Sequence, residues 1–236
     1  MEAYRKAIDL GVEMIECDVN ITRDGKLVMI HDATLDRTTS GTGRVSAATW
    51  EEIQQLDAGG KFKAEFTGLK VPLTEDTLLL YKDSGVWSCF EVKGGDADES
   101  NRIALGLVDL FEKHNMLDKA FMSSYHYEAL QLARSKCPDL MLAPERLPDD
   151  APADPPEAVR QAKLFSAPVI QHQYTVLTED VVRLLHENEI AVWSWSTTDE
   201  DSMIFSINIG ADALMGDDVA LMLEILNRMR PVSPTG

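Results

Sequence analysis

The chain has 236 residues and a net charge of −18 at pH 7, with 40 acidic side chains against 22 lysines and arginines. This length suits one large domain with a sizeable core, and the lack of a basic stripe argues against nucleic acid and anionic membrane surfaces as partners. No apolar run approaches the ~20 residues of a membrane span, and three cysteines without disulfide or zinc spacing favour a reducing, cytoplasmic setting.

Helical and extended patterns alternate from the start of the chain. Residues 2–10 have helical spacing that ends at Gly11, and residues 12–19 form the first predicted strand. Asp24-Gly25 predicts a hairpin turn, because this pair accepts the positive φ angles that a tight turn requires. A return strand over residues 26–30 follows from that turn.

The rest of the chain continues the alternation after an irregular stretch. Thr49, with Glu52 three residues later, has the spacing of a capping box and predicts a short helix. Residues 56–72 are polar and irregular, 147–157 are proline-rich and read as a long loop, and 231–236 read as a loose tail. Helices are predicted at 74–82, 99–114, 127–135, 158–165, 178–187, 199–207 and 218–230. Strands are predicted at 86–92, 119–123, 140–143, 168–171, 191–195 and 213–215.

This alternation predicts an α/β fold with a parallel sheet. The strands are short and apolar, as in Phe121-Met122 and Val169-Ile170, which suits burial on both faces. Seven strands alternate with helices and the chain opens on a helix, whereas a TIM (β/α)8 barrel begins with a strand and has eight. The count therefore predicts a barrel without its first strand. A doubly wound open sheet is the alternative, but no glycine-rich fingerprint follows a first strand.

Carboxylates gather on the first predicted strand. Strand residues alternate between faces, so Glu16 and Asp18 point the same way and Cys17 points the other. Two neighbouring carboxylates on a buried strand repel each other and lose hydration. A hard divalent cation held by oxygen ligands is the simplest partner for them. The hairpin return would carry His31 towards the same pair.

A second polar pair ends the strand at 86–92. Glu91 and Lys93 share a face by the same alternation, and Gly94-Gly95 behind them allows close approach of backbone or ligand. Three carboxylates and one lysine at the carboxyl ends of barrel strands indicate a divalent cation together with an anion such as phosphate. The alternative is an internal Glu91–Lys93 ion pair without any ligand. Glu145 and His172 also follow strand ends, where we expect them to face solvent or satisfy loops.

These motifs resemble the glycerophosphodiester phosphodiesterase family. The similarity is dense over residues 1–95 and thinner beyond. The matching segments are Ile15-Glu16-Cys17-Asp18-Val19, Thr22-Arg23-Asp24-Gly25-Lys26-Leu27-Val28, His31-Asp32-Ala33-Thr34-Leu35-Asp36-Arg37-Thr38-Thr39-Ser40-Gly41-Thr42-Gly43, Leu56-Asp57-Ala58-Gly59, Val71-Pro72-Leu73-Thr74-Glu75, Glu91-Val92-Lys93, Trp195-Ser196-Thr197-Thr198-Asp199-Glu200 and Asp212-Ala213-Leu214-Met215-Gly216-Asp217. Thr198 and Gly216 depart from the family's usual asparagine and threonine.

The resemblance implies a single TIM-barrel domain over residues 1–236, with a small insertion over about 20–72. It implies that one Mg²⁺ or Ca²⁺ is held by three carboxylates, and that glycerophosphodiesters are hydrolysed to sn-glycerol 3-phosphate and an alcohol. His31 would act as acid or base, Lys93 would bind a phosphate oxygen and Trp195 would line the pocket. The three carboxylates are Glu16, Asp18 and Glu91.

The family's His-Arg-Gly motif, which carries a second histidine on the first strand, is absent. Residues 1–7 resemble the middle of the family's first helix, so we expect a truncated chain that is less stable or pairs with a second copy as a homo-oligomer. A signal peptide on the missing segment stays open. Two other functions also stay open. One is an impaired metal- or phosphate-binding homologue, and the other is a sphingomyelinase-D-like phospholipase, which Glu91-Val92-Lys93 and the full Arg-Thr-Thr-x-Gly-x-Gly stretch at 37–43 disfavour.

Overall fold

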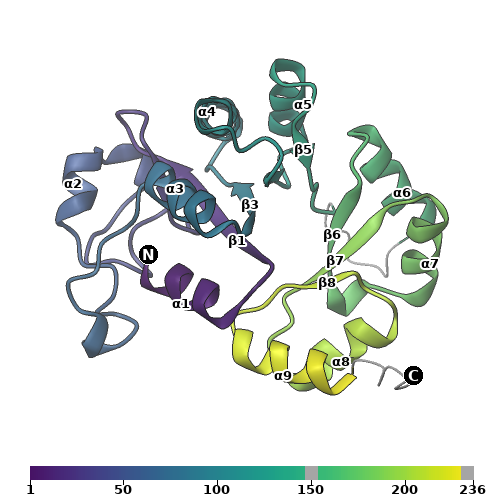
Figure 1. Cartoon of the computed structure of the whole chain (residues 1–236). Coiled ribbons are helices and arrows are strands. Elements are labelled where there is room, and N and C mark those ends of the chain that lie inside the picture. The colour runs from purple at the N-terminus through teal and green to yellow at the C-terminus, as the bar shows by residue number, and fades with distance from the viewer. Residues whose placement is uncertain (147–153, 230–236) are drawn as a thin grey trace. The chain divides into compact units, whose positions relative to one another are not determined.

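A computed structural model describes residues 1–146 and 154–229 (Figure 1). The chain divides into two compact units, one of Met1–Ile8 and Glu13–Leu142, the other of Asp9–Val12 and Ala143–Gly236. The predicted tail at 231–236 and most of the predicted loop at 147–157 lie outside the described residues. None of the helices in the described ranges is long and apolar enough to span a membrane.

The first unit is built on a five-stranded sheet with the order β2-β1-β3-β4-β5. Its strands are β1 (Met14–Ile21), β2 (Leu27–Met29), β3 (Trp87–Val92), β4 (Ala120–Ser123) and β5 (Met141–Leu142). Its helices are α1 (Glu2–Leu10), α2 (Trp50–Gln55), α3 (Thr74–Ser84), α4 (Ala97–His114) and α5 (Tyr127–Lys136). The last two residues of α1, 9 and 10, belong to the second unit. β1, β3, β4 and β5 run parallel, and β2 returns antiparallel along β1.

The second unit contains a three-stranded parallel sheet with the order β6-β7-β8. Its strands are β6 (Val169–Gln173), β7 (Ala191–Trp195) and β8 (Ala213–Leu214). Its helices are α6 (Pro155–Leu164), α7 (Glu179–Glu187), α8 (Glu200–Asn208) and α9 (Val219–Met229). Within residues 1–146 and 154–229, seven strands thus run parallel to a neighbour, which confirms the predicted number. The prediction of a further strand before them stays a prediction.

Local sequence signals explain most element boundaries. Gly11 ends α1 at φ 87° and Gly25 closes the β1–β2 hairpin at φ 81°, in the left-handed region that glycine adopts without a Cβ penalty. Thr49 accepts a hydrogen bond from the Glu52 N–H, and the Glu52 carboxylate accepts one from the Thr49 N–H, so the predicted capping box is present.

Several predicted boundaries differ from the structure by one to three residues, and two of these differences have a clear physical cause. β1 runs to Ile21 instead of ending at residue 19, because it pairs with β3 up to Val19 and with β2 from Val19 onward. α6 begins at Pro155, inside the predicted loop, because a proline in the first helical turn lacks only an N–H that has no partner in the helix.

The core of the first unit lies between its sheet and the covering helices. α4 packs against β1, β2, β3 and α5 (Figure 1). Its Phe111 ring lies 5.4 Å from the ring of Phe90 on β3, and both side chains are buried. Cys17, on the same face as Phe90, is buried as well. The apolar face of β1 and β3 is therefore anchored to helices, which leaves the opposite face for polar side chains.

Candidate functional site

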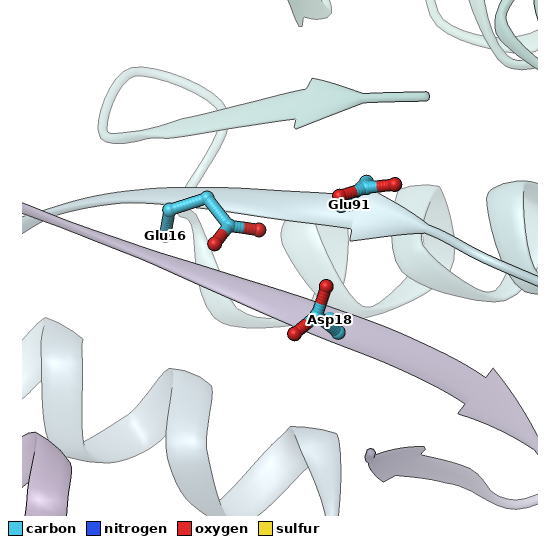
Figure 2. A group of neighbouring side chains, drawn as sticks. All are labelled: Glu16, Asp18 and Glu91. Carbon is cyan, nitrogen blue, oxygen red and sulfur yellow. The ribbon is translucent and has the colours of Figure 1, made fainter. Parts of the chain in front are cut away.

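Three carboxylates meet on the polar face of two neighbouring parallel strands. Glu16 and Asp18 come from β1 and Glu91 from β3, and Figure 2 shows their carboxylates on adjacent ribbons, turned towards one another. One oxygen of each lies within 4.8 Å of one oxygen of each other. Asp18 is the register partner of Glu91, and paired residues of parallel strands project to the same side. The predicted convergence of these carboxylates is therefore present, within the described part of the chain.

Burial raises the free-energy cost of keeping the carboxylates of this cluster ionised. Glu91 is only 8% exposed, and Glu16 and Asp18 are half-buried. Carboxylates so close together in a partly dehydrated place repel one another, and cations or hydrogen-bond donors must offset that repulsion. The donor set is all oxygen, the ligand type that Mg²⁺ and Ca²⁺ prefer.

Lys93 supplies positive charge at the cluster. Its Nζ lies 2.5 Å from Glu91 Oε1 and 3.1 Å from Asp18 Oδ1. The ion pair considered from the sequence is therefore real, and it extends to β1. Three carboxylates against one ammonium still leave an excess of negative charge, so the ion pair and a bound cation are compatible.

His31 lies just beyond the end of β2 and its side chain is 60% exposed. Its Nδ1 is 2.8 Å from Asp32 Oδ1. Arg37 binds the same carboxylate with two nitrogens, at 2.6 Å and 2.7 Å. These bonds from Arg37 and His31 hold the pKa of the Asp32 carboxyl far below its usual range. Asp32 therefore stays ionised at neutral pH and can accept a hydrogen bond from His31 Nδ1. The other ring nitrogen, Nε2, is then the one that can take up or give up a proton.

The second unit holds the remaining predicted residues. Trp195 ends β7 and is partly buried, and its predicted place at the substrate stays a prediction. Glu145 and His172 are buried, so the expectation that they face solvent was wrong. His172 Nδ1 lies 2.9 Å from the carbonyl oxygen of Gln173, which for His172 fits the alternative of satisfying local backbone.

Sequence reasoning assigned no role to two residues around His31. Arg37 stands in one of the motifs of the resemblance, but its two hydrogen bonds to Asp32 link residues five positions apart in irregular chain, where no periodic pattern indicates a contact. Asn20 was not singled out, although it continues the alternate row of Glu16 and Asp18 along β1. That alternation was the signal that could have found it.

Comparisons with known proteins agree with this fold. A profile of the glycerophosphoryl diester phosphodiesterase family matches residues 1–221. A glycerophosphodiester phosphodiesterase of Caldanaerobacter subterraneus subsp. tengcongensis is 28% identical over 226 residues, 96% of this chain and 90% of the relative. A glycerophosphodiester phosphodiesterase of Bacillus altitudinis is 25% identical over 237 residues, 98% of this chain and 93% of the relative.

Solved structures match over nearly the whole chain. The structure of an Oleispira antarctica phosphodiesterase in complex with its product sn-glycerol-3-phosphate has a TM-score of 0.86 and 21% identity, and the match covers 95% of this chain and 89% of that one. A glycerophosphodiester phosphodiesterase from Agrobacterium tumefaciens has a TM-score of 0.76 and 25% identity, with 93% and 90% covered. The α/β fold is thus that of phosphodiester hydrolases. The chain belongs to the glycerophosphoryl diester phosphodiesterase family.

Proposed function

We propose that this chain hydrolyses glycerophosphodiesters to sn-glycerol 3-phosphate and an alcohol, and that the reaction depends on one divalent cation. The observation that carries the proposal is the cluster of Glu16, Asp18 and Glu91 beside Lys93. Membership of the family supports the reaction class, and the product named for the Oleispira antarctica structure supports the substrate class. The TM-score of 0.86 supports the finer fold that we propose, a TIM barrel.

The residues present fit the proposed cation. Glu16, Asp18 and Glu91 would hold one Mg²⁺ or Ca²⁺, because three carboxylates within 4.8 Å offer hard oxygen ligands and an excess of negative charge. When bound, such an ion polarises phosphoryl oxygens and offsets the negative charge that grows on them during hydrolysis.

Lys93 would bind the phosphate directly. Its ammonium group is a point charge with three donors, which suits a phosphate oxygen. Its Nζ lies 2.5 Å from Glu91 and 3.1 Å from Asp18, so a phosphate oxygen bound to Lys93 would be held next to the same carboxylates. We propose that Trp195 lines the pocket for the substrate, as the resemblance implies.

His31 would transfer the proton. With Nδ1 bonded to Asp32, its Nε2 can accept a proton from the attacking group or give one to the leaving alkoxide. The exposed ring leaves room for a substrate to reach that nitrogen. Asp32 keeps its charge at neutral pH and so stabilises the imidazolium that forms when Nε2 takes the proton.

The test is turnover of glycerophosphocholine, glycerophosphoethanolamine and glycerophosphoglycerol by the wild type with Mg²⁺ or Ca²⁺. We expect release of sn-glycerol 3-phosphate, and its loss in Glu16→Gln, which keeps the shape of the side chain and removes its charge. Glu187→Gln is the matched control, because Glu187 pairs with Arg183 on the surface of α7. No turnover in the wild type, or equal turnover in Glu16→Gln, would contradict the proposal. Faster hydrolysis of sphingomyelin or lysophosphatidylcholine would overturn the substrate class.

A further inference from the structure

Asn20 stands at a junction between the loops that carry His31 and Lys93. It lies on the face of β1 that holds Glu16 and Asp18, two residues further along the strand. It is only 2% exposed. A buried carboxamide costs free energy unless its donors and its acceptor are bonded, so its partners define what it does.

The amide nitrogen of Asn20 bonds the backbone that carries His31. Nδ2 donates to the carbonyl oxygen of Ile30 at 2.8 Å, with those of His31 and Asp32 at 3.3 Å and 3.2 Å. The strand β2 ends at Met29, and the last backbone bond to β1 is the Ile30 N–H to the Asp18 carbonyl at 3.2 Å. Beyond the last backbone hydrogen bond of the sheet, the Asn20 side chain therefore supplies the donor for the carbonyl groups of residues 30–32.

The carbonyl oxygen of the same side chain bonds the backbone behind Lys93. Asn20 Oδ1 accepts a hydrogen bond from the Gly94 N–H at 3.2 Å. Gly94 has φ 94°, and a Cβ there would lie 2.8 Å from the Ser100 nitrogen, so this turn admits only glycine without strain. The turn behind Lys93 is therefore closely packed against Ser100, and Asn20 connects the histidine loop to it.

We propose that Asn20 is a positioning residue, which fixes the backbone of His31 relative to that of Lys93. The inference deepens the proposed function and rests on it, because it gives the two residues their proposed roles. His31 is exposed and has little packing of its own to hold it in place. Proton transfer depends on geometry, and a displacement of about 1 Å can lower a rate by about 100-fold.

The variant Asn20→Asp separates the two halves of the junction. A carboxylate of the same shape keeps an acceptor for the Gly94 N–H but has no proton for the carbonyls of residues 30–32. The backbone at His31 should therefore loosen while the turn at Gly94 stays. Asn188→Asp is the matched control, since Asn188 Nδ2 donates to the Leu184 carbonyl at 2.8 Å, at the end of α7. Asn20→Ser, which is uncharged, replaces Asn20→Asp if the latter does not fold.

Two measurements test the proposal. The first is NMR of histidine ring signals, assigned with His31→Gln. We expect one narrow set for His31 in the wild type and in Asn188→Asp, and a broadened or doubled set in Asn20→Asp. The second is steady-state kinetics on glycerophosphocholine, where kcat should fall by about 10- to 100-fold in Asn20→Asp, with KM and cation affinity changed less than about threefold.

Unchanged His31 signals would overturn the proposal, and so would a fall in kcat no larger than in Asn188→Asp. A new carboxylate at position 20 could also act on the cation, and calorimetry with Mg²⁺ separates that effect, because a tightened cation site with unchanged His31 signals counts against positioning. If the wild type turns over none of the glycerophosphodiesters, the proposed function fails, and the NMR result alone then decides whether Asn20 holds the His31 loop.

Discussion

At the scale of single residues, Asp32 shows how a surface carboxylate can stabilise the fold and orient a neighbour. The Arg37 guanidinium binds it through two nitrogens, and together with His31 lowers the pKa of the Asp32 carboxyl. A lowered pKa contributes stability that is present above the unfolded value of ~3.9 and is lost as the pH falls through the folded value. The part that comes from Arg37 should therefore be constant from pH 5 to 8 and disappear in acid.

Asp32→Asn should lower the free energy of unfolding by about 0.5–1 kcal/mol at pH 7, the upper part of the range for exposed pairs. We expect a loss in the upper part of this range because Arg37 binds Asp32 through two nitrogens, and bidentate hydrogen bonds to a carboxylate are stronger than single ones. Urea unfolding at pH 7, 5 and 3 would measure it, and the difference from wild type should shrink at pH 3. Asp180→Asn is the control, since Arg183 bonds Asp180 with one nitrogen at an exposed position. A difference that is as large at pH 3 as at pH 7 would mean that charge is not the cause.

Replacing Lys93 should change cation affinity and product affinity in opposite directions. Its ammonium group pairs with Glu91 and Asp18, so Lys93→Met should leave their mutual repulsion uncompensated and raise the affinity for Mg²⁺ or Ca²⁺. Affinity for sn-glycerol 3-phosphate should fall by about 10-fold or more, because a hydrogen bond to a charged group contributes about 1.5–3 kcal/mol. Calorimetry with the metal and with the product would separate these effects. A parallel loss of both would make Lys93 a structural partner only.

At the scale of elements, the sequence predicted what periodicity and turn chemistry determine. The alternation of Glu16, Cys17 and Asp18 predicted which face is polar, and the Asp24-Gly25 turn predicted the return of β2 along β1. Neither signal predicts the contacts of irregular segments, because those contacts depend on the conformation of the loops. The hydrogen bonds of Arg37 with Asp32 and of Asn20 with Ile30 could therefore be found only from the three-dimensional structure.

The same limit applies to element ends. β1 extends to Ile21 because it exchanges β3 for β2 as its partner, and the local turn signal indicates that a return strand follows but not where the ladder ends. The three carboxylates could be predicted because parallel strands bring their carboxyl ends to one edge, so a residue type at each end suffices. The ion pair of Lys93 with Asp18 could not, since it depends on the register between the strands.

α4 permits a test of where the stability of the first unit lies. Phe111 is buried against Phe90 of β3, and Phe111→Ala should lower the free energy of unfolding by about 3–5 kcal/mol. Phe62, 75% exposed, is the control, and Phe62→Ala should change stability by no more than about 0.5 kcal/mol. Urea denaturation of both variants measures the difference. Similar losses would show that α4 is not the element that anchors the sheet.

At the scale of the whole molecule, the charge of −18 sets a general repulsion. Salt screens exposed charges, with a Debye length of ~10 Å at 0.1 M and ~3 Å at 1 M. The melting temperature should therefore rise by several degrees between about 20 mM and 0.5 M NaCl, where like-charge repulsion outweighs the surface ion pairs. Thermal unfolding followed by circular dichroism would measure it. A melting temperature that falls with salt would mean that favourable pairs dominate.

Specific cation binding must be distinguished from general screening. Measuring in 0.5 M NaCl does this, because exposed charges are then already screened before Mg²⁺ or Ca²⁺ is added. A ligand that binds only the folded chain stabilises it by about 2.7 kcal/mol at 100 times its dissociation constant. For a chain of this size that corresponds to a rise of about 5–10 °C in melting temperature. We expect this rise with Mg²⁺ or Ca²⁺ in the wild type and in Glu187→Gln, which removes an exposed acid of α7. It should vanish in Glu16→Gln, because two carboxylates remain where three converged. An equal rise in both variants would show that the cations act through the acidic surface as a whole, and the carboxylates of β1 and β3 would then need another partner.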